Sequence, residues 1–172
     1  MLLTIGAIIL LGTIILTTDG EINSTDQTLN TTNFGLEEVA LATKIIEEAE
    51  ATAFDENVAL GNPINTANDF TPPRSLGTEG AEGNNANYFN DFDDWNGVPG
   101  GAGLILTYDN LATGNYRALT QVKYVKYNTV THTLDTTSSS SQYAKRLDVW
   151  VWNTVDSSKT GVIHMFTVKG YW

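Results

Sequence analysis

The chain has 172 residues, which is enough for one modest domain with an appendage but too few for two independent cores. Its 20 acidic and 9 basic residues give a formal net charge of −11, and this argues against a nucleic-acid partner because phosphate binding needs a clustered basic surface. The absence of cysteine excludes disulfides, thiolate metal sites and cysteine nucleophiles.

The first segment, MLLTIGAIILLGTIIL, carries no charged residue from Met1 to Leu16. As a helix it would span roughly 27 Å by residue 18, close to the hydrocarbon thickness of a bilayer. A secretory signal peptide would have a basic start and a small-residue cleavage site, and a simple membrane anchor would have a basic flank. The first basic residue here is Lys44. The segment therefore predicts an apolar helix for a membrane or for the core of an assembly.

The chain continues with a helical pattern as far as residue 54. Apolar residues recur every seven positions at Ile22, Leu29 and Leu36, which indicates one apolar helical face. Threonines and Gly20 interrupt residues 17–33, so this stretch is predicted as a weak helix that could melt, whereas residues 36–54 are predicted as a strong amphipathic helix.

The last two-thirds of the chain have a β pattern. A proline-containing loop covers residues 62–87, and strands rich in Val, Ile, Thr and aromatic residues are predicted at 104–108, 116–127, 129–135, 147–153 and 162–172. The predicted fold class is α+β, with a long N-terminal hydrophobic-then-amphipathic helix and a C-terminal antiparallel β-sheet head. The predicted domains are a helix over residues 1–56, apolar over 1–18, and a β-rich head over 57–172.

An apolar N-terminal run that leads into an amphipathic stretch ending near residue 54 resembles the first helix of type IV pilins and type II secretion pseudopilins. The resemblance covers about the first third of the chain. It implies a pilin-like fold and a mature subunit whose basic leader a prepilin peptidase has removed, leaving a methylated N-terminus. Family members commonly have glutamate as the fifth mature residue, and this chain departs from that pattern with Ile5.

The function implied by the resemblance is that of a structural subunit of an extracellular type IV pilus-like filament on the cell surface, of the kind that serves adhesion, motility, DNA uptake or secretion. The subunit would reside in the inner membrane before assembly and would then polymerise as a homo-oligomer, with an assembly ATPase and a platform protein as partners. The predicted filament core consists of Met1, Leu2, Leu3, Ile5, Ile8, Ile9, Leu10, Leu11, Ile14, Ile15 and Leu16. The alternative is a membrane-tethered surface binding module, carbohydrate-binding or adhesin-like, with Trp150 and Trp152 on one strand face as its platform.

The loop NYFNDFDDWNG concentrates hard oxygen ligands of the kind that calcium requires. The candidate metal ligands are Asp91, Asp93, Asp94 and Asn96, although the spacing is not that of an EF-hand. The alternative is a solvated turn in which the Asp side chains cap backbone N–H groups. No other cofactor is expected.

Catalysis is not expected. His132 and His164 fall on predicted strands, without a serine elbow, an HExxH pattern or a phosphate loop nearby. Two sequons, at Asn23 and Asn30, are candidate glycosylation sites if the protein is extracellular, and they are also short enough to arise by chance.

Overall fold

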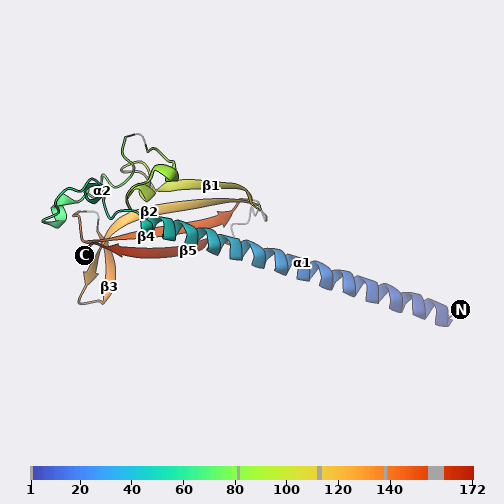
Figure 1. Ribbon diagram of the computed structural model, residues 1–172. Coiled ribbons are helices and arrows are strands. Elements are labelled where there is room, and N and C mark those ends of the chain that lie inside the picture. Colours follow the sequence, from blue (N-terminus) through green and yellow to red (C-terminus); the bar gives the residue numbers. More distant parts are fainter. Residues whose placement is uncertain (1, 81, 112–113, 138, 155–160) are drawn as a thin grey trace. The chain divides into compact units, whose positions relative to one another are not determined.

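The computed structural model describes residues 2–80, 82–111, 114–137, 139–154 and 161–172 (Figure 1). Its helices are α1 (Leu2–Ala51) and α2 (Glu56–Ala59), with 3-10 turns η1 (Ala67–Asp69), η2 (Ala86–Tyr88) and η3 (Asp94–Asn96). The strands are β1 (Leu104–Leu111), β2 (Gly114–Asn128), β3 (Thr133–Thr137), β4 (Ala144–Asn153) and β5 (Ile163–Gly170).

The chain forms two compact units, residues 1–37 and residues 38–172, which we call the helical unit and the head. The sequence places this boundary at residue 56, whereas the structure places it at residue 38 because the last turns of α1 belong to the core of the head. In the helical unit, side chains are described at residues 11, 13–18, 21–22, 24–25, 28–29 and from 32 onward.

The threonine-rich part of the helical unit is helical, although its sequence predicts only a weak helix. Thr18, Thr25 and Thr32 donate their hydroxyl hydrogen bonds to the carbonyl oxygens of Ile14, Glu21 and Thr28, four residues earlier, at 2.8 to 2.9 Å. These bonds satisfy the hydroxyls within the helix itself, on the same carbonyl oxygens that accept the backbone N–H groups of the helix.

The predicted fold class is wrong in one respect, the apolar character of the first helix. Among the described residues, no helix is long and apolar enough to cross a membrane. The 20 helical residues from 32 to 51 are described without a gap, and six of them are charged: Glu37, Glu38, Lys44, Glu47, Glu48 and Glu50. Lys44, Glu47, Glu48 and Glu50 are exposed and keep the outer face of the helix in water, whereas Glu38 is buried and accepts the Asn153 N–H.

The five strands form one antiparallel sheet in the order β1-β2-β4-β5, and β3 pairs with the last residues of β2. The predicted antiparallel strands are confirmed with shifted ends and one change of order, since β4 rather than β3 pairs with the middle of β2. The shift is largest at β3, which begins at Thr133 rather than Thr129. There the side-chain oxygen of Asn128 accepts the N–H groups of Val130 and Thr131 and closes a turn.

One face of the sheet carries the main core, and the last turns of α1 pack against it (Figure 1). The helix contributes Leu41, Ala42, Ile45 and Ala49, which recur at helical spacing. The strands contribute Leu104, Leu106, Tyr116, Ala118, Val122, Leu147, Val149 and Val151, while Phe89, Phe92 and Trp95 come from the loop before β1. A second cluster, Phe54, Phe70, Leu76 and Tyr124, lies under the segment that follows α1.

Strand β5 fixes the C-terminal end of α1. The sequence predicts that one face of this strand lies on the helix, and the face with Met165, Thr167 and Lys169 does so. Met165 packs against the core, Thr167 donates to Glu50, and the Lys169 Nζ atom donates to the carbonyl oxygen of Glu50 at 2.9 Å. A cation bound to the last carbonyls of a helix satisfies unpaired acceptors and interacts favourably with the helix dipole.

Candidate cation site

The loop before β1 is closed by two aspartates that cap each other. The Asp91 Oδ1 atom accepts the N–H groups of Asp93 and Asp94 at 2.7 and 3.2 Å. The Asp94 Oδ2 atom accepts the N–H groups of Asn90 and Asp91 at 2.9 and 3.1 Å. Each carboxylate therefore uses one oxygen to hold the turn and keeps the other, Asp91 Oδ2 or Asp94 Oδ1, buried without a hydrogen-bond partner among the described residues.

Three glutamates approach these aspartates from other segments. Glu56 begins α2, and a backbone hydrogen bond of 3.0 Å from Ala53 to Asn90 holds the end of α1 beside the loop. Carboxylate oxygens of Glu56, Glu79 and Asp91 lie within 4.8 Å of one another, and so do those of Glu79, Glu82 and Asp94. The two groups share Glu79, so we call Glu56, Glu79, Glu82, Asp91 and Asp94 together the acidic cluster.

Burial and mutual repulsion make these carboxylates hard to ionise. Burial, with the neighbouring Asp93 and Asp94 charges, raises the pKa of Glu79 from 4.5 to about 8. The same causes raise the pKa of Asp91 from 3.8 to about 9. Burial also raises the pKa of Asp94, to about 6, against the opposing effect of its backbone hydrogen bonds.

Beside the acidic cluster lies a fully buried lysine. The Nζ atom of Lys145 on β4 is 2.5 Å from the Asp93 Oδ1 atom and 2.8 Å from the Asp55 Oδ2 atom, and all three side chains are fully buried. It also donates to the Phe54 carbonyl oxygen at 2.9 Å. Asp55 in turn accepts the Thr71 N–H at 2.9 Å. Lys145 thus ties β4 to the end of α1 and to the loop.

The structure brings together only part of the predicted metal site. Asp91 and Asp94 lie in the acidic cluster, whereas Asp93 turns to Lys145. Asn96 instead connects two segments by hydrogen bonds. Its Nδ2 atom donates to the Leu76 carbonyl oxygen and its Oδ1 atom accepts the Val122 N–H, both at 3.0 Å. Sequence reasoning missed Glu56, which begins α2, and Glu79 and Glu82, whose only signal is that they are acidic residues in a glycine-containing loop.

The other predicted sites are only partly described. Of the predicted filament core, the side chains of Leu11, Ile14, Ile15 and Leu16 are described, and all four are exposed. The remaining core side chains, Met1, Leu2, Leu3, Ile5, Ile8, Ile9 and Leu10, lie outside the described part, as do the side chains of the two sequon asparagines, Asn23 and Asn30.

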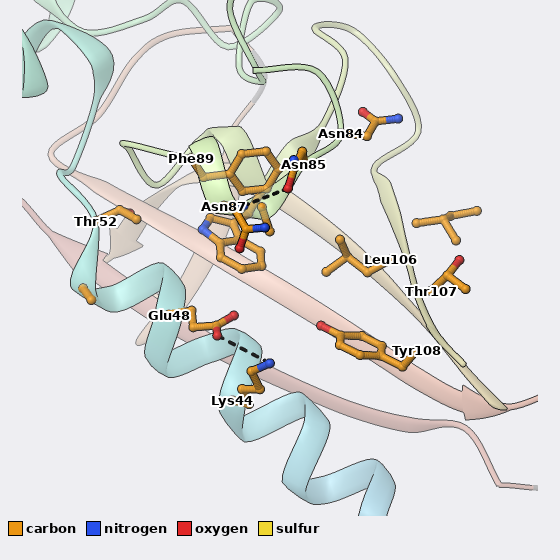
Figure 2. A pocket seen from close by; sticks show the side chains of 14 residues that line it. Lys44, Glu48, Thr52, Asn84, Asn85, Asn87, Phe89, Leu106, Thr107 and Tyr108 are labelled. Atoms are coloured by element: carbon orange, nitrogen blue, oxygen red, sulfur yellow. Dashed lines mark hydrogen bonds and ion pairs between the residues drawn. The ribbon is translucent and has the colours of Figure 1, made fainter. Parts of the chain in front are cut away.

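The head also has a groove of about 730 Å³ between α1, β1 and the loop at residues 84–89 (Figure 2). The helix side carries Lys44 and Glu48, which form an ion pair of 3.6 Å, and the Lys44 ammonium lies 5.8 Å from the ring centroid of Tyr108 on β1. Asn85 and Phe89 line the loop side. Amide, charged and aromatic groups therefore mix along this groove.

Trp150 and Trp152, the predicted aromatic platform, are both half-buried. They line a shallow hollow of about 320 Å³ with Leu119 and Val162. The Trp150 ring stacks on His164 at 4.7 Å between centroids and 8° between planes, and Leu119 is its partner on β2. One face of the Trp150 ring is therefore occupied by His164.

Comparison with protein-family models, with curated proteins and with solved structures yields no match to this chain. The resemblance to the pilin superfamily therefore stays a prediction that rests on the sequence features described above.

The raised pKa values of Glu79 and Asp91 predict a stability that falls with rising pH. These carboxyl groups hold protons in the folded chain that they release in the unfolded chain, so their contribution to stability is lost as pH rises towards about 8 and about 9. In the presence of a chelator, the free energy of unfolding should decrease between about pH 6 and about pH 9. Urea titrations of the wild type and of a Glu79→Gln, Asp91→Asn double variant test this. In the double variant the free energy of unfolding should depend less on pH. A wild-type free energy of unfolding that stays constant or rises between these pH values would contradict the prediction.

Proposed function

We propose that the chain is the structural subunit of an extracellular, type IV pilus-like filament, and that copies of it associate through the helix of the helical unit. The observation that carries this proposal is one apolar stripe on that helix. Ile15, Ile22, Leu29 and Leu36 follow one another at intervals of seven residues, and Leu11 shares their face. Their side chains are between 52 and 65% exposed.

A stripe of this kind favours helix-to-helix association. Burying one apolar side chain of this size is worth roughly 1.5 to 3 kcal/mol. Five such side chains on one face therefore favour association of this helix with another apolar helix. Residues seven apart return to the same side of a helix, which is the spacing by which helices pack along their length. A second copy of the chain offers a matching stripe of the same length.

The threonines of this helix do not oppose such burial. The hydroxyl groups of Thr18, Thr25 and Thr32 are already bonded to backbone carbonyl oxygens of the same helix. A polar group that keeps its hydrogen bond can leave water at low cost. The helix can therefore be enclosed by neighbouring helices without leaving these hydroxyls unpaired.

The alternative, a membrane-tethered binding module, has less support. It needs accessible aromatic rings, whereas one face of the Trp150 ring is stacked on His164. Self-association through the stripe does not require such rings.

Two substitutions of equal charge test the proposal. Ile22→Asp places a carboxylate in the centre of the stripe, and we expect it to abolish assembly. Ser24→Asp adds the same charge two residues away on the opposite side of the helix, where the side chain is exposed, and we expect assembly close to that of the wild type. Sedimentation at high speed separates filaments from free subunits.

Both variants should keep a folded head, because the four tryptophans, at 95, 150, 152 and 172, all lie there and report on its packing by near-UV circular dichroism. An Ile22→Asp protein that sediments like the wild type would show that the stripe is not the assembly surface.

A further inference from the structure

We propose that the head binds a hard divalent cation of the calcium class, held by carboxylate oxygens of Glu56, Glu79, Asp91 and Asp94. This ligand set differs from the one that the loop sequence suggests. It draws on three separate segments, namely the start of α2, the loop near residue 79 and the turn before β1.

The spacing of the oxygens of Glu56, Glu79 and Asp91 fits a single ion. Calcium binds its oxygen ligands at 2.3–2.6 Å, so oxygens around one ion lie at most roughly 4.6–5.2 Å apart. The carboxylate oxygens of Glu56, Glu79 and Asp91 lie within 4.8 Å of one another. Asp94 lies next to these three through Glu79, because the oxygens of Glu79 and Asp94 meet the same limit in a second group that also contains Glu82. Glu82 is left out of the ligand set because both of its oxygens are already engaged, by the N–H of Glu79 and the amide of Asn90.

Unpaired buried oxygens supply an independent reason to expect a ligand. Asp91 and Asp94 are fully buried, and Asp91 Oδ2 and Asp94 Oδ1 have no hydrogen-bond partner among the described residues. One oxygen each of Glu56 and Glu79 is in the same state. A buried acceptor without a partner costs free energy, more so when it is charged, and a cation bound among these carboxylates would offset that cost.

Neighbouring side chains do not supply that cation. Lys145 is the adjacent buried positive charge, and its ammonium group is bonded to Asp55, Asp93 and the Phe54 carbonyl oxygen. Lys169, on the other side, donates to the carbonyl oxygens at the end of α1. The acidic cluster therefore faces two lysines whose donors are directed elsewhere.

The chemistry of the ligands selects the class of ion. All four are carboxylates, which prefer hard cations such as calcium, whereas zinc and copper favour sites with imidazole or thiolate ligands. The chain has no cysteine, and its histidines, His132 and His164, lie at the β2-β3 turn and on β5, outside the acidic cluster.

A bound ion would connect three segments of the head that contain little regular secondary structure. The ion would tie α2, the residue-79 loop and the turn at Asp91 to Asp94 into one unit beside the end of α1. A ligand that binds only the folded chain stabilises it in proportion to the logarithm of its free concentration. The head should therefore unfold at a higher temperature in calcium than in a chelator.

The test uses the full chain, stripped with a chelator and titrated with calcium chloride by calorimetry, and then melted with and without the ion. We expect binding with one ion per chain and a rise in melting temperature. Glu79→Gln and Asp91→Asn should each weaken binding at least about tenfold, because calcium affinity depends on the number of charged ligands. Glu47→Gln, which removes an exposed charge on α1, should bind calcium like the wild type.

The stability of the variants in chelator shows whether Glu79 and Asp91 bind the ion or only support the fold. Both site variants remove repulsion within the acidic cluster and keep an oxygen acceptor, so without calcium they should be at least as stable as the wild type. The proposal is overturned if calcium leaves the melting temperature of the wild type unchanged. It is also overturned if calcium raises the melting temperature of both site variants as much as that of the wild type.

Discussion

Replacing Lys145 with methionine is expected to lower the free energy of unfolding of the head by about 3–5 kcal/mol, the usual cost of breaking a buried ion pair by removing one partner. The methionine would fill a similar volume but would leave Asp55 and Asp93 fully buried without their cation. It would also remove the ammonium group that lies 4.7 Å from the Phe54 ring centroid. Urea unfolding followed by tryptophan fluorescence measures the loss.

Two further variants make this result specific. Lys126→Met removes an exposed lysine from β2 and should change stability by less than about 0.5 kcal/mol. Adding Asp93→Asn to Lys145→Met removes one of the two stranded charges and should recover part of the loss, which a double-mutant cycle quantifies. If Lys145→Met proved as stable as Lys126→Met, the buried ion pair would not contribute to the stability of the head.

Replacing Ile45 with alanine is expected to destabilise the head by about 2–5 kcal/mol, the range for deleting a large buried aliphatic side chain. Ile45 is fully buried at the centre of the α1 face that covers the sheet, between Ala42 and Ala49. The small alanines let the helix approach the strands closely, so the cavity left by Ile45 has little room to collapse.

Leu36→Ala is the matched control for this prediction. Leu36 is 65% exposed, so its truncation should change the stability of the head by less than about 0.5 kcal/mol. Because Leu36 belongs to the apolar stripe, the same change should weaken assembly, whereas Ile45→Ala acts on the head. Equal losses of head stability in the two variants would contradict the assignment of Ile45 to the core and of Leu36 to the surface.

Much of the sheet could be predicted from the sequence because its alternation is regular. Leu147, Val149 and Val151 occupy every second position of β4 and all face the core. The helix that ends near residue 54 could also be predicted, since its apolar positions recur at helical spacing. The membrane-grade character expected of the first helix was wrong, because the described part of α1 is not apolar enough to cross a membrane.

The acidic cluster and its neighbouring ion pair could be predicted only in part, because they depend on contacts between distant segments. Lys145 is 90 residues from Asp55 and 52 from Asp93. One local signal was present, since Lys145 shares the inward face of β4 with Leu147 and Val149, where a lysine needs a buried partner. The sequence did not indicate which carboxylates would supply it.

We propose that copies of this chain assemble through the apolar stripe of the helical unit. Negative-stain electron microscopy of the purified full chain, at neutral pH and without detergent, tests it most directly. We expect thin filaments of uniform width that disappear in the Ile22→Asp protein and persist in the Ser24→Asp protein. Dispersed single particles in the wild type at every concentration, with a folded head, would contradict it.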